Sequence, residues 1–208
     1  VYANPLVSGG YAYRYHSERI RRVDDLPSCN LLVRAGVLRE LGGFNTRYWP
    51  GEDTILCSEI VHRLGHLMFY DPWTVVHHHR RPLFGPHLRQ VGRYALHRGF
   101  FARRFPTTSR RPGYMLPSLL VLGVAFGGLA GLAHPLLGRL YVGTVSAYLL
   151  VTFLGAFNRR PSTWLMTWAG IVATHMVYGT RFLQGICSRA MPCETARFDH
   201  PSETVKAT

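Results

Sequence analysis

Residues 112–133 read PGYMLPSLLVLGVAFGGLAGLA and contain no Asp, Glu, Lys, Arg or His. Apart from His134, the uncharged run continues to Gly138, and roughly 20 apolar residues are enough for a helix to cross a bilayer. Two further apolar runs follow directly, and three such runs in series are improbable in a soluble core. The sequence therefore predicts about three transmembrane helices. Their expected ranges are 112–138, 140–158 and 161–180.

Positive charge is concentrated just before these runs. The 208 residues include 24 Lys and Arg and 11 Asp and Glu, which gives a formal net charge of +13. No acidic residue lies between Asp71 and Glu194, whereas arginine occurs at positions 80, 81, 89, 93, 98, 103, 104, 110 and 111. Arginine next to a membrane helix is typical of its cytosolic end and suits anionic lipid headgroups. We therefore expect a multi-pass protein of the plasma membrane with a cytosolic polar part, and no nucleic acid as partner.

The polar part contains signals for both helices and strands. Residues 33–41 and 54–64 have apolar side chains at helical spacing and are followed by glycine stops. Residues 66–70 and 73–77 are short, apolar and rich in β-branched or aromatic side chains, as strands are. Residues 86–105 form a basic amphipathic segment, which indicates a helix in the membrane interface.

These signals define the predicted organisation of the chain. Residues 1–111 are expected to form an α/β part that includes the interfacial helix at 86–105. Residues 112–185 hold the membrane helices, and residues 186–208 form a polar tail.

Several short motifs follow one another in the polar part. They are Gly42-Gly43-Phe44-Asn45, Gly51-Glu52-Asp53, Arg63-Leu64-Gly65 and Asp71-Pro72. Together they resemble the pattern G-G-F-[DN], [GN]-E-D, R-[ALR]-x-G and D-P of family 2 glycosyltransferases. The resemblance extends upstream to Pro27–Arg34 and downstream to Gln90-Val91-Gly92-Arg93-Tyr94, which is similar to the family's Q-x-x-R-W. The segment His175–Gly179 resembles the membrane tail of the succinoglycan-type branch.

The resemblance implies an inverting transfer of a sugar from a nucleotide-sugar donor to a hydroxyl of a lipid-linked or glycan acceptor, in cell-envelope or exopolysaccharide synthesis. Such a transfer needs a carboxylate that removes the acceptor proton as the anomeric carbon is attacked. In the family pattern Asp53 would be this general base, and Glu52 would shape the site or contact the acceptor. Arg93, whose planar charged fork suits a diphosphate, would bind the donor. Gln90 and Tyr94 would lie beside it in the substrate site.

The resemblance also implies a fold and a cofactor. Residues 1–111 would be the acceptor-side half of a GT-A Rossmann-like domain. The donor-binding half of such enzymes carries a D-x-D motif that holds a divalent metal, Mg²⁺ or Mn²⁺, on the diphosphate. This chain has no D-x-D. We therefore expect the donor half upstream of Val1, and we expect residues 1–208 to be inactive by themselves.

Within the chain itself we predict no metal site. Asp24-Asp25 lies just before the acceptor-side segment, where a structural or acceptor-facing role is expected. Consecutive strand residues point to opposite faces, so His77, His78 and His79 do not suit one ion. His79 is instead expected to assist binding of the acceptor or the diphosphate. The cysteines lack metal-site spacing and are expected to stay reduced; they are Cys29, Cys57, Cys187 and Cys193.

Other interpretations of these residues remain open. A Glu-Asp pair at a helix start also complements the helix dipole without any catalytic role, and His175 within an apolar run is either functional or structural. A membrane channel or transporter subunit with a cytosolic α/β domain would need polar residues along its spans, where His134 and His175 are the titratable ones. A membrane-tethered, basic nucleic-acid-binding module would bind DNA with a strong salt dependence, but it would leave the Gly-Glu-Asp pattern unexplained.

Overall fold

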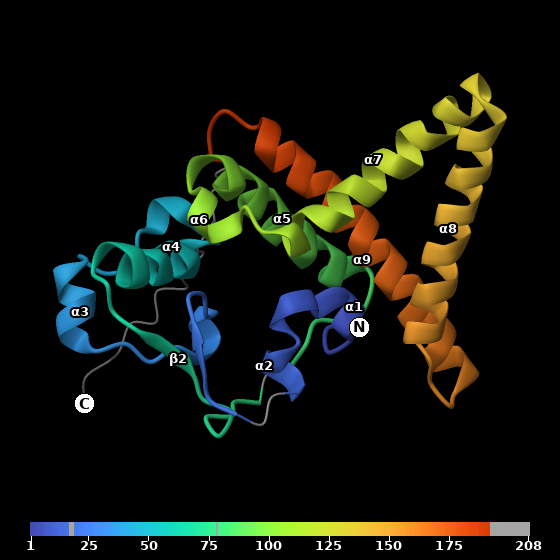
Figure 1. Ribbon diagram of the computed structural model, residues 1–208. Coiled ribbons are helices and arrows are strands. Elements are labelled where there is room, and N and C mark those ends of the chain that lie inside the picture. The colour runs from blue at the N-terminus through green and yellow to red at the C-terminus, as the bar shows by residue number, and fades with distance from the viewer. Residues whose placement is uncertain (17–18, 78, 192–208) are drawn as a thin grey trace, which may run out of the picture.

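The computed structural model describes residues 1–16, 19–77 and 79–191, and it is dominated by helices (Figure 1). Within these ranges its one sheet consists of two antiparallel strands, β1 (Arg21–Val23) and β2 (Met68–Tyr70). Arg21 pairs with Tyr70, and Val23 pairs with Met68. The prediction of an α/β, Rossmann-like part is therefore wrong, because the described chain has only this small sheet.

The segment at 73–77, predicted as a strand, has no regular structure. The Asp71 carboxylate accepts hydrogen bonds from the backbone N–H of Trp73 at 2.9 Å and from the hydroxyl of Thr74 at 3.2 Å. Such local bonds close a turn and compete with the backbone ladder of a sheet. The turn at Asp71 therefore replaces the second predicted strand.

Short helices make up most of the remaining polar part. In chain order they are α1 (Pro5–Ser8), η1 (Gly9–Tyr11), α2 (Tyr13–His16), η2 (Ser28–Asn30), α3 (Ala35–Glu40), η3 (Thr46–Tyr48), α4 (Glu52–Ser58), η4 (Glu59–Arg63) and α6 (Pro106–Ser109). The helix predicted at 33–41 is α3, which stops at Gly42 and Gly43, both with positive φ. The helix predicted at 54–64 is α4, extended by the π-helical turn η4.

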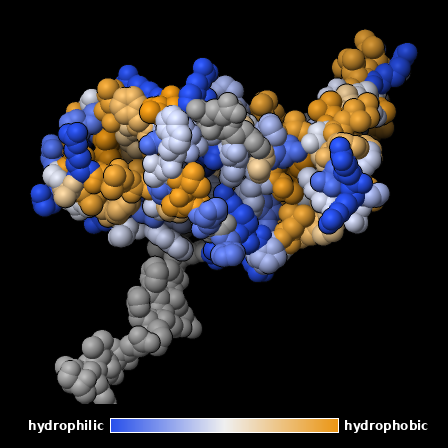
Figure 2. Space-filling model, turned by 90° about the horizontal axis from the view of Figure 1, so that it is seen from below, coloured by the Kyte–Doolittle hydropathy of each residue, from blue (hydrophilic) through white to orange (hydrophobic). Residues whose placement is uncertain are grey.

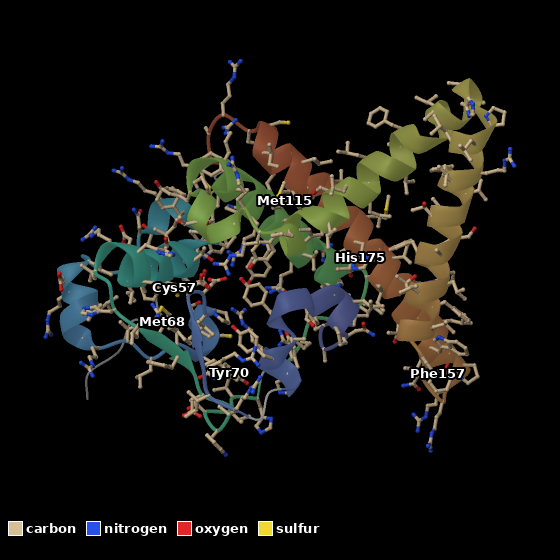
Figure 3. All side chains as sticks on the ribbon, in the orientation of Figure 1. Cys57, Met68, Tyr70, Met115, Phe157 and His175 are labelled. Carbon is tan, nitrogen blue, oxygen red and sulfur yellow. The ribbon has the colours of Figure 1, made fainter. Side chains whose placement is uncertain are left out.

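The longest helix of the polar part is α5 (Gly85–Arg104), which confirms the helix predicted at 86–105. Helix α4 lies between α5 and the small sheet and buries side chains toward both. Toward the sheet lies a cluster of Leu56, Cys57, Ile60 and Met68, in which Cys57 and Met68 are side by side (Figure 3). Toward α5 lies a cluster of Ile55, Phe100 and Phe101. Burial raises the pKa of the unpaired Cys57 thiol to about 12, as expected for a packed cysteine.

Two helices in the described part of the chain are long and apolar enough to cross a membrane, α7 (Pro112–Ala133) and α8 (Pro135–Gly155). They form the arm at the right of Figure 1, and Figure 2 shows hydrophobic side chains along it. Most of their surface is not covered by the rest of the chain. At the tip the two helices approach closely at Gly131 and Gly138. These helices support an association with the membrane.

The third predicted span, 161–180, belongs to the longer helix α9 (Pro161–Cys187). This helix packs along α5 and also contacts α7 (Figure 1). Its positions Gly179, Phe182 and Gly185 are buried in these contacts. Of the three predicted spans, those at α7 and α8 meet the length and apolar composition needed to cross a membrane, and no other helix in the described ranges does.

The contact between α5 and α9 depends on two glycines. A Cβ atom on Gly185 would collide with the carbonyl oxygen of Leu96 and lie 2.9 Å from the nitrogen of Phe100. A Cβ atom on Gly99 would collide with the carbonyl oxygen of Phe182. These neighbours are backbone atoms of packed helices. They cannot move away by a side-chain rotation, as the end of a flexible side chain could.

We predict that Gly185→Ala pushes α5 and α9 apart and lowers the free energy of unfolding by about 1–3 kcal/mol, as overpacking does. Gly123→Ala in α7 is the matched control, since no atom lies within 4 Å of its Cβ position and alanine is the better helix former. Thermal unfolding of both variants in one detergent measures the difference. Equal unfolding midpoints would contradict the close contact.

Candidate functional site

A pocket of about 210 Å³ lies where the first residues of α4 meet α5. Its wall consists of Ser28, Trp49, Pro50, Glu52, Asp53, Arg81, Gln90, Arg93 and Tyr94. Five of the six site residues predicted from the sequence are in this wall, and they come from two motifs far apart in the chain. The Gly-Glu-Asp motif supplies Glu52 and Asp53, and the Gln-x-x-Arg-Tyr motif supplies Gln90, Arg93 and Tyr94.

Gly51 allows α4 to begin this close to α5. A Cβ atom at this buried position would lie 2.6 Å from Cε2 of Phe101 and 3.2 Å from the carbonyl oxygen of Tyr48. The Phe101 ring is itself buried in the core, so it has little room to move. Glycine is therefore required before Glu52 and Asp53 for steric reasons.

The carboxylate of Asp53 is held by two backbone groups. Its Oδ2 accepts a hydrogen bond from the N–H of Ser28 at 3.1 Å, and its Oδ1 accepts one from the N–H of Thr54 at 2.7 Å. An ionised carboxylate has about four acceptor positions, so these two bonds fix its orientation and leave capacity for a further donor. A ligand hydroxyl in the pocket could be that donor.

Glu52 is in a different environment from Asp53. Its Oε2 is buried and has no hydrogen-bond partner among the described residues. Burial, together with the neighbouring charge of Asp53, raises the pKa of the Glu52 carboxyl above its ordinary value. Buried polar atoms are generally satisfied by protein, water or ligand. Glu52 thus lines the pocket with a carboxyl group whose buried Oε2 is not satisfied by the described residues.

The α5 side of the pocket supplies an amide, from Gln90, and a phenol, from Tyr94. Oε1 of Gln90 accepts a hydrogen bond from the hydroxyl of Tyr2 at 3.1 Å. Burial raises the pKa of Tyr94, and the charges of Asp53 and Glu52 raise it further. Tyr94 is therefore a neutral hydrogen-bonding group facing the two carboxylates.

Behind the pocket, buried Asp25 connects α4 to α5. Its Oδ2 lies 2.6 Å from Nη2 of Arg98 in α5, and its Oδ1 accepts from the hydroxyl of Thr54 in α4 at 3.3 Å. Arg14 is a second cation near the same carboxylate, at 4.0 Å. Burial disfavours the Asp25 anion, but Arg98 and Arg14 outweigh this effect and hold its pKa below the usual value. Asp25 therefore has a structural role, one of the two expected for Asp24-Asp25.

The same group of polar side chains reaches the first residues of α7. Arg111 donates to Asp24 at 2.5 Å, and the hydroxyls of Tyr11 and Tyr114 are hydrogen bonded. The Arg98 guanidinium lies 4.9 Å from the centroid of the Tyr114 ring. The helices that form the pocket are thereby tied to the start of the apolar arm.

Four residues of the pocket wall are not predicted by the sequence. Arg81 belongs to an arginine run that is interpreted as lipid-facing, and Ser28 acts through its backbone N–H, which no side-chain pattern reveals. Trp49 and Pro50 directly precede the Gly-Glu-Asp motif. Their position beside this motif is the signal that could have identified them.

The predicted binding residue His79 is not in the pocket wall. No group of three or more His, Cys, Asp or Glu side chains that could hold a metal occurs in the ranges that the structure describes, and His78 and Cys193 lie outside them. The divalent metal that the resemblance implies would be held by a D-x-D motif that this chain lacks, and it stays a prediction for the full-length protein.

His175, the titratable residue of the third apolar run, connects three segments. Its Nδ1 lies 3.0 Å from the hydroxyl of Tyr148 in α8, and its Nε2 lies 2.9 Å from the carbonyl oxygen of Leu6 in α1. Both ring nitrogens therefore have partners. This geometry favours the structural interpretation of His175 over the functional one.

No protein-family model, curated protein or solved structure matches the chain. The resemblance to family 2 glycosyltransferases therefore rests on the short motifs alone. A function can be proposed only from these motifs and from the pocket that their residues form.

Proposed function

We propose that this protein is a membrane-bound, inverting glycosyltransferase, which moves a sugar from a nucleoside diphosphate donor to a hydroxyl of a lipid-linked or polysaccharide acceptor. The process served would be cell-envelope or exopolysaccharide synthesis. The observation that supports this proposal is the shared pocket of the Gly-Glu-Asp and Gln-x-x-Arg-Tyr motifs. Only the glycosyltransferase interpretation requires these two motifs to act on one ligand.

In the proposed reaction Asp53 is the general base. It accepts the proton of the acceptor hydroxyl while the hydroxyl oxygen attacks the anomeric carbon from the face opposite the leaving diphosphate. The backbone bonds from Ser28 and Thr54 keep its carboxylate in one orientation during this step. Glu52, whose carboxyl lies beside Asp53 in the pocket wall, accepts a second hydrogen bond from the acceptor.

The donor is held from the α5 side in this proposal. Arg93 presents a planar guanidinium that can bind phosphate oxygens through two parallel hydrogen bonds. Gln90 and Tyr94, which lie in the same wall, contact the sugar with their polar groups. The Trp49 side chain adds an apolar surface to the same wall.

The proposed orientation places the pocket on the cytosolic side of the plasma membrane. The apolar arm of α7 and α8 begins next to Arg110 and Arg111, and no acidic residue follows until Glu194. Cytosolic ends of membrane helices carry an excess of such positive residues. Nucleotide sugars added to the cytosolic side would therefore reach the pocket.

Vesicles test the function and the orientation together. Sealed inverted and right-side-out vesicles, from cells with and without the full-length protein, are incubated with radiolabelled UDP-, GDP- and dTDP-sugars. We expect protein-dependent incorporation into the lipid or polymer fraction from at least one donor, in inverted vesicles only. Absence of protein-dependent incorporation from every donor would contradict the function, and incorporation in right-side-out vesicles alone would contradict the orientation.

A further inference from the structure

Two guanidinium groups, those of Arg81 and Arg93, line the pocket. The Arg81 side chain is exposed and forms no ion pair with any residue in the described ranges. The adjacent Arg80 is different, because its guanidinium lies 4.8 Å from the centroid of the Tyr2 ring and donates to the hydroxyl of Tyr15 at 3.2 Å. Of these two neighbouring arginines, only Arg81 contributes its charge to the pocket wall.

The carboxylates of the pocket do not neutralise Arg81. Asp53 is bonded to backbone N–H groups, and Oε2 of Glu52 has no partner within the described chain. The segment that carries both arginines has no acidic residue from position 72 to position 193. The pocket wall therefore holds guanidinium and carboxylate groups, and within the described ranges Arg81 forms no ion pair with either carboxylate. This combination suits a ligand that has both anionic oxygens and hydroxyls.

We propose that Arg81 is a ligand-binding residue and that Arg81 and Arg93 together bind a diphosphate ester. This inference rests on the proposed function and names a residue and a chemical group for its pocket. A guanidinium donates two parallel hydrogen bonds to phosphate oxygens, and a diphosphate has one phosphoryl group for each arginine. Hydroxyls of the bound substrates then face Glu52 and Asp53. The ester is either a soluble nucleoside diphosphate or a diphosphate lipid from the membrane.

Binding of two probes to the full-length protein in nanodiscs tests this inference. UDP represents the soluble source, and farnesyl diphosphate dissolved in the nanodisc lipid represents the membrane source. Arg81→Gln is expected to weaken binding of the probe that the wild type binds by about tenfold or more, because a charge-assisted, bidentate contact is lost. Arg80→Gln removes the same charge one position away, and we expect it to weaken binding by less than about threefold.

The inference is overturned if the wild type binds neither probe, or if the two substitutions weaken binding equally. Its failure differs from a failure of the proposed function. Sugar transfer by the wild type, with unchanged diphosphate affinity in Arg81→Gln, would overturn this inference and leave the function intact. Diphosphate binding that depends on Arg81, without sugar transfer from any donor, would support this inference and overturn the function.

Discussion

Asp25→Ala is expected to lower the free energy of unfolding by about 3–5 kcal/mol, the usual cost of removing one partner from a buried ion pair. The Asp25 side chain is buried, and its carboxylate bonds to Arg98 at 2.6 Å and to Thr54 at 3.3 Å. Without it, the charges of Arg98 and Arg14 would remain inside the protein uncompensated. The same bonds join α4 to α5, so the pocket should loosen before the protein unfolds.

Asp24→Ala is the matched control for this prediction. Asp24 pairs with Arg111 at 2.5 Å, but about a third of each side chain is exposed, with relative values of 37% and 32%. Partly exposed pairs contribute only about 0–1 kcal/mol. Chemical unfolding of both variants in detergent measures the two losses. Equal losses would contradict the assignment of Asp25 as the central anion of the buried group.

The pH dependence of this effect has a defined sign. The folded pKa of Asp25 is lowered, so its charge contributes stability above the unfolded pKa of about 3.9. That contribution is lost as the pH falls from there through the folded pKa. The stability difference between wild type and Asp25→Ala should therefore be full at neutral pH and shrink below about pH 4.

Sequence patterns within single segments predicted several of the helices that those segments form. The apolar runs correspond to α7 and α8, the basic amphipathic segment corresponds to α5, and two glycines end α3. The motif resemblance also selected five residues that line one pocket. For the helices, the signal and the structural feature lie in the same few residues, whereas the pocket joins two motifs that are far apart in the chain.

Features that depend on distant contacts were not predictable in this way. Helix α9 lies on α5 because Gly99 and Gly185 permit close contact, and neither glycine indicates its partner. Arg98 and Arg93 look alike in the sequence, yet five residues of helix turn them about 140° apart. Arg98 therefore forms an ion pair with buried Asp25, whereas Arg93 lines the pocket. The strand predicted at 73–77 failed because the Asp71 side chain closes a turn there.

Asp53→Asn is expected to lower the turnover of sugar transfer by about 10²-fold or more in the full-length protein, since general-base catalysis contributes about 10²–10⁴-fold. Asparagine has nearly the same size and keeps one of the two backbone hydrogen bonds through its Oδ1, but its Nδ2 cannot accept the other, and it cannot take up the acceptor proton. The loss of turnover should therefore appear in kcat, and the lost backbone bond should lower the free energy of unfolding by about 1–3 kcal/mol. Glu59→Gln is the control, because Glu59 lies in η4, pairs with Arg63 and is outside the pocket wall.

The most direct test of the whole account is the initial rate of transfer from the active donor, measured per folded molecule for wild type, Asp53→Asn and Glu59→Gln in inverted vesicles. Folded protein is quantified in each preparation by its thermal unfolding transition. We expect a rate at least about 10² times lower for Asp53→Asn and a rate near that of the wild type for Glu59→Gln. A near-normal rate in well-folded Asp53→Asn would contradict the assignment of the pocket as a glycosyltransferase active site.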